Sequence, residues 1–331
     1  MRAGAEAPPV QRAGGDLVRP VGRSVAHRPG RDHGAVAGTP YRRVVTSAPI
    51  DGVAERRSTD RWLRLDGTTN TRDLGGLPTA DGGTTIPGRV LRSDNLQTLS
   101  DADVRRLVDD VRLREVVDLR TTAEVLLEGR GPLRAVPGVR HRHFTLLPER
   151  GHHTDVFAVE EDDLPELPAG WAESILPRQV AEGDQEEPPA VRSYLGYLAH
   201  RPDNVVAALR ALAADTDGAT VVHCAAGKDR TGVVVAFALA VAGVPHEEIV
   251  ADYALTADVI DDLVAKLAAS PTYAEDMVSR DVASHTPRAE TMQRVLELLE
   301  ERHGGPAGWL TEHGFGPGEQ AALRARLRDQ S

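Results

Sequence analysis

Hydrophobic and polar positions follow two kinds of pattern along the chain, and these predict strands and helices in turn. Short runs rich in apolar and β-branched residues are typical of strands buried in a sheet. We expect four such strands, at residues 89–93, 113–119, 139–147 and 220–222. The stretch at residues 70–76 contains Asn, Asp and two adjacent Gly residues and is predicted to form a turn.

Helices are indicated where apolar residues recur every three or four positions. They are expected at residues 101–110, 192–199, 204–215, 247–255, 257–269 and 289–303, with a last helix ending near residue 328. Ser100 and Thr122 are predicted to cap the helices that follow them. Residues 232–242 are apolar on all sides, which is typical of a central buried helix. Strands alternating with helices, followed by helices only, predict one α/β domain with a helical C-terminal half.

Two segments depart from this pattern and set the expected domain boundaries. Residues 1–60 are rich in Gly, Pro and Arg without a sustained period, so we expect a disordered tail, with a basic arm for an acidic partner as the alternative. Residues 61–331 are expected to form the folded domain. Within it, residues 150–190 are predicted to be an acidic insertion or lid, because eleven acids and one arginine lie between Asp155 and Glu187.

The composition excludes several classes of protein. A net charge of −11 speaks against a general nucleic-acid binder. Cys224 is the only cysteine, so an internal disulfide and a cysteine-based zinc site are excluded. The histidines are scattered, and we expect neither a metal nor a cofactor. No apolar run is long enough to span a bilayer and no signal peptide is visible, so a soluble, cytoplasmic protein is expected.

The neighbours of Cys224 give this single thiol a chemical role. An apolar strand runs into the loop His223-Cys224-Ala225-Ala226-Gly227-Lys228-Asp229-Arg230-Thr231-Gly232, and an apolar helix opens at its last residue. The backbone N–H groups of such a turn point inward, and the helix N-terminus adds the positive end of its dipole, so the loop is an anion site. These surroundings favour the thiolate of Cys224, which is placed for in-line attack on a bound phosphoryl group.

The other loop residues are expected to hold the phosphate. The residues predicted to contact it are Ala225, Ala226, Gly227, Lys228 and Gly232. Gly227 allows the close approach of a phosphate oxygen to the backbone. Arg230 brings a planar guanidinium that can bind two phosphate oxygens at once. Lys228 either adds positive charge for the substrate or is a solvated surface lysine.

Thr231 and His223 have supporting roles in this interpretation. The Thr231 hydroxyl can donate a hydrogen bond to the sulfur and stabilise it as a leaving group, and it can equally cap the helix. His223 is expected to brace the loop by hydrogen bonds rather than to transfer a proton. The loop residues alone therefore predict a cysteine-dependent phosphatase.

Cys-x5-Arg-Thr preceded by His resembles the signature loop of the protein tyrosine phosphatase superfamily. More narrowly, residues 227–232 resemble those of the mycobacterial-type tyrosine phosphatases and their bacterial relatives. Further segments fit that subfamily: Asn70-Thr71-Arg72-Asp73, Leu91-Arg92-Ser93-Asp94, Val117-Asp118-Leu119-Arg120 and Ala251-Asp252-Tyr253. The resemblance implies a central, partly parallel sheet flanked by helices. It also implies activity on phosphotyrosine, and in some members on phosphoserine, phosphothreonine and phosphoinositides.

Departure of the alcohol requires a proton donor, which the family usually supplies from a Trp-Pro-Asp loop that this chain lacks. Three carboxylic acids are candidates. Asp229 is the first choice by analogy with the subfamily, and its alternative role is to brace the loop. Glu149 lies where the movable acid loop should fall, and it can equally be a surface acid. Asp118, at a strand end, is expected to pair with an arginine and support the scaffold.

Other functions remain open from the residues. Lys228 in the order Ala-Gly-Lys resembles the loop of the tumour-suppressor phosphoinositide 3-phosphatase, so an inositol phosphate substrate is the main alternative, although Asp229 replaces a glycine there. A phosphate-binding pseudophosphatase is a second alternative, against which Cys224, Arg230 and Thr231 all speak. A rhodanese or arsenate reductase is a third, but the reductases need further cysteines. The expected partner is thus a phosphotyrosine protein or a phosphoinositide.

Overall fold

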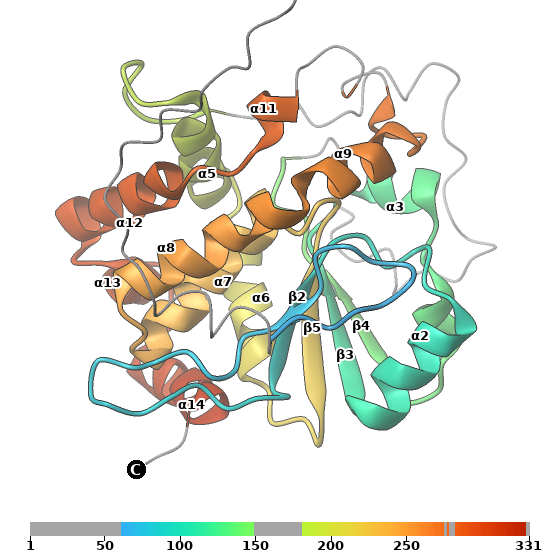
Figure 1. The fold of residues 1–331 in the computed structure, drawn as a ribbon. Helices are drawn as coiled ribbons and strands as arrows, with labels where there is room; N and C mark the ends of the chain where they lie inside the picture. The colour runs from blue at the N-terminus through green and yellow to red at the C-terminus, as the bar shows by residue number, and fades with distance from the viewer. Residues whose placement is uncertain (1–60, 149–180, 275–276, 278–281, 329–331) are drawn as a thin grey trace, which may run out of the picture. The chain divides into compact units, whose positions relative to one another are not determined.

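Five strands form one sheet in the order β1-β2-β5-β3-β4 (Figure 1). Their bounds are β1 (Arg72–Asp73), β2 (Val90–Ser93), β3 (Leu113–Asp118), β4 (Arg140–His143) and β5 (Ala219–His223). The four strands from β2 to β4 in this order pair parallel with one another, and β1 pairs antiparallel with β2. The partly parallel sheet that the resemblance implies is therefore confirmed. Strand β5 is central, so the residues that follow its carboxyl end lie at the middle of one edge of the sheet.

The computed structural model describes residues 61–148, 181–274, 277 and 282–328. The predicted tail at 1–60 and most of the predicted insertion at 150–190 lie outside these residues. Residues 181–188, the described end of that insertion, are non-helical and mostly exposed.

Helices account for most of the remaining described chain. They are α2 (Asp101–Arg105), α3 (Thr122–Glu128), α5 (Pro189–His200), α6 (Pro202–Ala213), α7 (Asp229–Ala242), α8 (His246–Ala254), α9 (Ile260–Ala268), α11 (Val282–His285), α12 (Ala289–His303), α13 (Pro306–Glu312) and α14 (Pro317–Leu327). Shorter turns of 3₁₀ helix span Pro132–Ala135 and Leu255–Val259, and a π-helical segment spans Arg106–Asp110. None of the helices in the described ranges has the length and apolar character needed to cross a bilayer.

Hydrophobic cores lie on both faces of the sheet. Successive strand residues point to opposite faces, and in β5 Val221 belongs to one core while Val222 belongs to the other. The larger core joins the sheet to α5–α8 and α12–α14, with α7 nearly enclosed within it. The smaller core joins the sheet to the π-helical and 3₁₀ turns that follow α2 and α3. An all-round apolar α7 is what this enclosed position requires.

Several local predictions are wrong in detail. Residues 72–73 form strand β1 within the predicted turn, and the strand predicted at 139–147 is confined to Arg140–His143. The helix predicted at 101–110 changes to π-helix after Arg105. Thr121, not Thr122, caps α3, because its side chain accepts from the Glu124 N–H. The helices α11 and α13 were not expected, and the segment predicted at 257–269 begins as 3₁₀ turn.

Candidate active site

The loop from Cys224 to Lys228 joins the end of β5 to the start of α7. Helix α7 begins at Asp229 rather than at Gly232, so Asp229, Arg230 and Thr231 form its first turn. The first N–H groups of a helix have no partner within it, and they carry the positive end of its dipole. Cys224 is 2% exposed and lies directly after β5, at the beginning of the loop that leads to this helix start. The cysteine and a helix start suited to an anion therefore belong to one short segment of the chain.

Hydrogen bonds from the surrounding scaffold to the loop carbonyls hold the loop in place. Three successive carbonyls accept hydrogen bonds from the scaffold: Ala225 from the Asn95 N–H (2.9 Å), Ala226 from Asn70 Nδ2 (2.9 Å) and Gly227 from Arg92 Nη2 (2.7 Å). In a trans peptide the N–H points opposite to the carbonyl. With these carbonyls turned toward the scaffold, the N–H groups of the following residues turn toward the concave side of the loop.

Gly227 is needed for this shape. Its φ is +64°, a region that favours glycine, and a Cβ there would lie 2.3 Å from the Ser93 carbonyl oxygen. At the far end of the loop, a Cβ on Gly232 would lie 3.0 Å from the Tyr253 ring. Both glycines thus permit close packing of the loop against its surroundings.

A buried ion cluster supports the scaffold beneath the loop. The Asp252 carboxylate lies 2.7 Å from Arg92 Nη1, 3.3 Å from Arg72 Nε and 2.9 Å from Arg61 Nη2. Burial alone would raise the pKa of Asp252, but the charges of these arginines outweigh it and hold the pKa below its ordinary value. From the sequence alone, the segments around Arg72, Arg92 and Asp252 are identified only by their similarity to the phosphatase subfamily. The structure shows that Asp252 orients the guanidinium that binds the Gly227 carbonyl.

Arg230 is held in place by a carboxylate that the sequence analysis missed. Glu124 binds it in bidentate fashion, with Nη1 at 2.6 Å and Nη2 at 2.9 Å from the two carboxylate oxygens. Burial alone would lower the pKa of Arg230, but Glu124 raises it well above its ordinary value, so the cation is permanent. The Tyr273 hydroxyl accepts from Arg230 Nη2 at 3.1 Å and donates to Glu124. The signal that could have found Glu124 is the capping box that it forms with Thr121.

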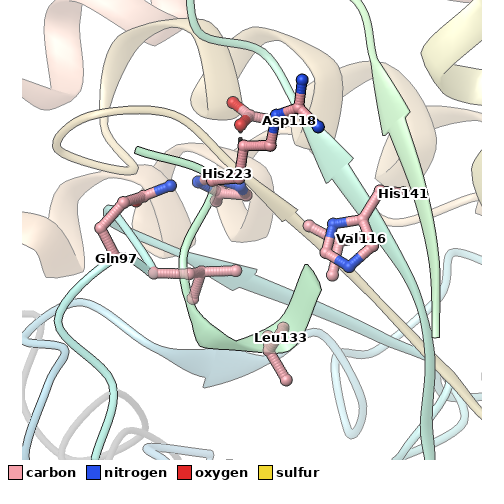
Figure 2. Close-up of a pocket in the computed structure, with 8 residues that line it drawn as sticks. Gln97, Val116, Asp118, Leu133, His141 and His223 are labelled. Atoms are coloured by element: carbon pink, nitrogen blue, oxygen red, sulfur yellow. Dashed lines mark ion pairs between the residues drawn. The ribbon is translucent and has the colours of Figure 1, made fainter. Parts of the chain in front are cut away.

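Asp118 and His223 lie side by side, at the ends of β3 and β5 (Figure 2). Asp118 binds Arg120 through Oδ2 at 2.6 Å, and the same oxygen lies 3.6 Å from His223 Nε2. Burial would raise the pKa of Asp118, but the Arg120 charge outweighs it and holds the pKa well below its ordinary value. Burial lowers the pKa of His223 to about 4, with Asp118 opposing the shift. His223 is therefore neutral at neutral pH, and Asp118 is ionised.

A small cavity of about 10 Å³ adjoins this pair and is lined in part by Gln97, Leu133 and His141 (Figure 2). Such a volume approaches the space that one buried water occupies. His223 Nδ1 lies 3.3 Å from the Cys224 carbonyl oxygen on the loop side. The imidazole thus connects the floor of the loop to the Asp118–Arg120 pair.

Asp229 and Lys228 lie at the outer side of the loop. Asp229 Oδ1 accepts a hydrogen bond from the Tyr194 hydroxyl at 2.6 Å, and Oδ2 lies 3.6 Å from Lys228 Nζ. Lys228 Nζ also donates to the His285 carbonyl at 2.6 Å. Thr231 is fully buried, and within the described part of the chain its hydroxyl has no hydrogen-bond partner.

The structure brings most of the predicted site residues together. His223, Cys224 and residues 225–232 form one continuous loop and helix start, with Asp118 beside His223. Glu149 lies outside the described residues, so its place among the candidate acids stays a prediction. Among the described ranges, no group of three or more metal-ligating side chains gathers at one point.

The model of the tyrosine phosphatase family matches residues 63–329. The triple specificity protein phosphatase PtpB of Mycobacterium tuberculosis is 27% identical over 80% of this chain and 98% of its own length. A tyrosine-protein phosphatase of Nostoc commune is 30% identical over 41% of this chain, a match that spans only 48% of the Nostoc protein. The chain accordingly belongs to the tyrosine phosphatase family, and with it to the phosphoric monoester hydrolases.

Proposed function

We propose that the protein hydrolyses phosphotyrosine and related phosphomonoesters through a cysteinyl-phosphate on Cys224. The observation that carries this proposal is the loop itself, in which three carbonyls turn outward around a buried cysteine while Arg230 is fixed by Glu124. The inward N–H groups and the Nε–H of Arg230 would bind the phosphate oxygens, since the two terminal nitrogens of the guanidinium already donate to Glu124, Leu119 and Tyr273. They would also stabilise the charge that builds up on these oxygens during transfer.

The reaction has two steps. In the first, the Cys224 thiolate attacks phosphorus, the ester P–O bond breaks, and Asp229 gives its proton to the leaving oxygen. In the second, water attacks phosphorus, the S–P bond breaks, and the Asp229 carboxylate takes the proton of the water. The Thr231 hydroxyl would then donate to the departing sulfur, a role that fits its lack of any other partner among the described residues.

Asp118 does not suit the role of proton donor, because its pairing with Arg120 keeps it ionised at neutral pH. Asp229 is one-third exposed at the side of the loop and is our choice. We expect Asp229→Asn to lower kcat/KM by roughly 10²–10⁴-fold for phosphate esters with poor leaving groups, and far less for good ones. A series of aryl phosphates with different leaving groups measures this. The same series with Glu149→Gln is the comparison, and a steeper dependence there would give the role to Glu149 instead.

A wider substrate range is the second candidate. Lys228 adds a further cation to the loop, which suits a multiply phosphorylated inositol, and one relative is named a triple specificity phosphatase. Asp229, 3.6 Å from Lys228 Nζ, reduces that positive charge. For this reason we place phosphoinositides after the phosphoproteins, and the family match favours phosphotyrosine over phosphoserine and phosphothreonine.

The substrate range can be tested directly with the full chain. Phosphate release should be measured on phosphotyrosine peptide, phosphoserine peptide and phosphoinositide vesicles in the presence of EDTA. We expect release from the phosphotyrosine peptide to have the highest kcat/KM. Faster release from the vesicles would replace the protein substrate with a lipid one, and no release from any substrate by folded protein would favour a binding module.

A further inference from the structure

Two buried tyrosines extend inward from Asp229. Tyr194, on α5, donates its hydroxyl proton to Asp229 Oδ1 at 2.6 Å. The Tyr194 oxygen lies 2.7 Å from the hydroxyl of Tyr253, on α8. Tyr194 and Tyr253 are 1% and 2% exposed, whereas the Asp229 side chain is 33% exposed. The three groups therefore form a line from the core to the surface of the site.

The number of available protons determines which group donates in each of these hydrogen bonds. Each tyrosine hydroxyl has one proton, and an ionised carboxylate can only accept. Since the Tyr194 proton goes to Asp229, the bond between the two tyrosines requires Tyr253 to be the donor. The order is Tyr253 to Tyr194 to Asp229. Aligned donors of this kind polarise one another, which strengthens each bond in a buried setting.

The two carboxylate oxygens of Asp229 consequently differ. Oδ1 faces inward and is bound by Tyr194, while Oδ2 faces Lys228 at 3.6 Å. A proton on Oδ2 leaves both tyrosine bonds intact, whereas a proton on Oδ1 would require both hydroxyls to reverse. The arrangement thus keeps the exchangeable proton on the outer oxygen.

The aromatic rings make this arrangement rigid. The rings of Tyr194 and Tyr253 meet edge to face at 80° with centroids 6.3 Å apart. On its other side Tyr194 stacks on Tyr197 at 5.8 Å and 25°. Ring contacts within α5 and between α5 and α8 therefore hold the two tyrosines in place, in addition to their hydrogen bonds. A flexible carboxylate at the first turn of α7 gains a fixed rotamer from these contacts.

We propose that Tyr194, backed by Tyr253, is a positioning residue that orients the Asp229 carboxyl group so that its outer oxygen exchanges the catalytic proton with the leaving group. This inference rests on the proposed role of Asp229 as the proton donor. A purely structural tyrosine pair would affect all substrates equally. A positioning pair affects those whose leaving group needs the proton.

The test compares kcat/KM of the full-length wild type and variants across a series of aryl phosphates. We expect Tyr194→Phe to lower kcat/KM about tenfold for the poorest leaving group and no more than about twofold for the best, as loss of a hydrogen bond to a charged group would produce. Tyr253→Phe should act in the same direction with a smaller effect. Tyr197→Phe, which removes a hydroxyl from the same helix that does not bond to Asp229, should keep the wild-type dependence on the leaving group.

The outcomes separate this inference from the proposed function. If Asp229→Asn steepens the leaving-group dependence and Tyr194→Phe lowers all rates in parallel, the tyrosine pair is structural and the inference is wrong. If Asp229→Asn leaves the dependence unchanged, the proposed acid is wrong and the inference falls with it. In the Asp229→Asn background, Tyr194→Phe should add no further change in leaving-group dependence, and an added change would also overturn the inference.

Discussion

Replacement of Cys224 by serine is expected to lower phosphate release by a factor on the order of 10⁴–10⁶, the largest effect on activity that we predict. A serine hydroxyl is a much weaker nucleophile than the thiol that it would replace. The protein would keep its anion site, because the carbonyl anchors and the Arg230–Glu124 pair do not involve the sulfur. Initial rates on phosphotyrosine peptide, measured at matched concentrations of folded enzyme, check the prediction.

Two further measurements make this result specific. Titration calorimetry should show that Cys224→Ser still binds inorganic phosphate, which neither protein consumes, with an affinity close to that of the wild type. Rapid acid quenching of the wild type with substrate should give a protein mass increased by one phosphoryl group, which the variant lacks. A variant that retains more than about one-hundredth of the wild-type rate would contradict a cysteine nucleophile.

Asp252→Ala is expected to lower the free energy of unfolding by about 3–5 kcal/mol, the largest effect on stability that we predict. The change would leave Arg72 and Arg92, both buried, without the carboxylate that they share with Arg61. Charges left unpaired in a buried site lose their solvation without compensation. Urea unfolding of wild type and variant measures the difference. The matched control is Asp217→Ala, whose exposed pair with Arg112 should contribute less than about 1 kcal/mol.

The pH dependence provides a second check on Asp252. Because the folded-state pKa of Asp252 is held below its ordinary value, its contribution to stability is complete above the unfolded-state pKa of about 3.9. It is lost as the pH falls through the lower folded-state pKa. Asp252→Ala should therefore lose less stability than the wild type on acidification below about pH 4. An equal loss in both proteins would show that Asp252 makes no such contribution.

Whether a site residue could be predicted depends on how far it lies along the chain from the residues that it contacts. The loop around Cys224 was predictable because its thiol, glycine, guanidinium and helix start are consecutive in the chain. The partners of that loop were not, because Asn70, Glu124 and Tyr194 reach it only through the fold. Asp252 lies in a segment whose similarity to the family is visible in the sequence, but its pairing with three arginines is not.

The same limit applies to secondary structure. The long helix α12 (Ala289–His303) has the predicted bounds, since four turns of periodic sequence outweigh local exceptions. Helix α13 has seven residues between Gly305 and His313, too few for a period to be recognised. The start of α7 was placed too late because its first turn is polar, and those polar residues belong to the site. Polar site residues in the first turn of a helix thus interrupt the apolar pattern from which the helix start would be predicted.

The hydrogen bonds that the scaffold donates to the loop carbonyls constrain how this sequence can evolve. The signature loop takes its curvature from hydrogen bonds supplied at Asn70, Arg92 and Asn95, which lie more than a hundred residues earlier. Its ten residues are therefore not a portable module. Grafted after another strand, they would carry the nucleophile without the cradle. Substitutions near residues 70–95 and in the loop should arise together rather than separately, as paired changes across two distant stretches of one chain.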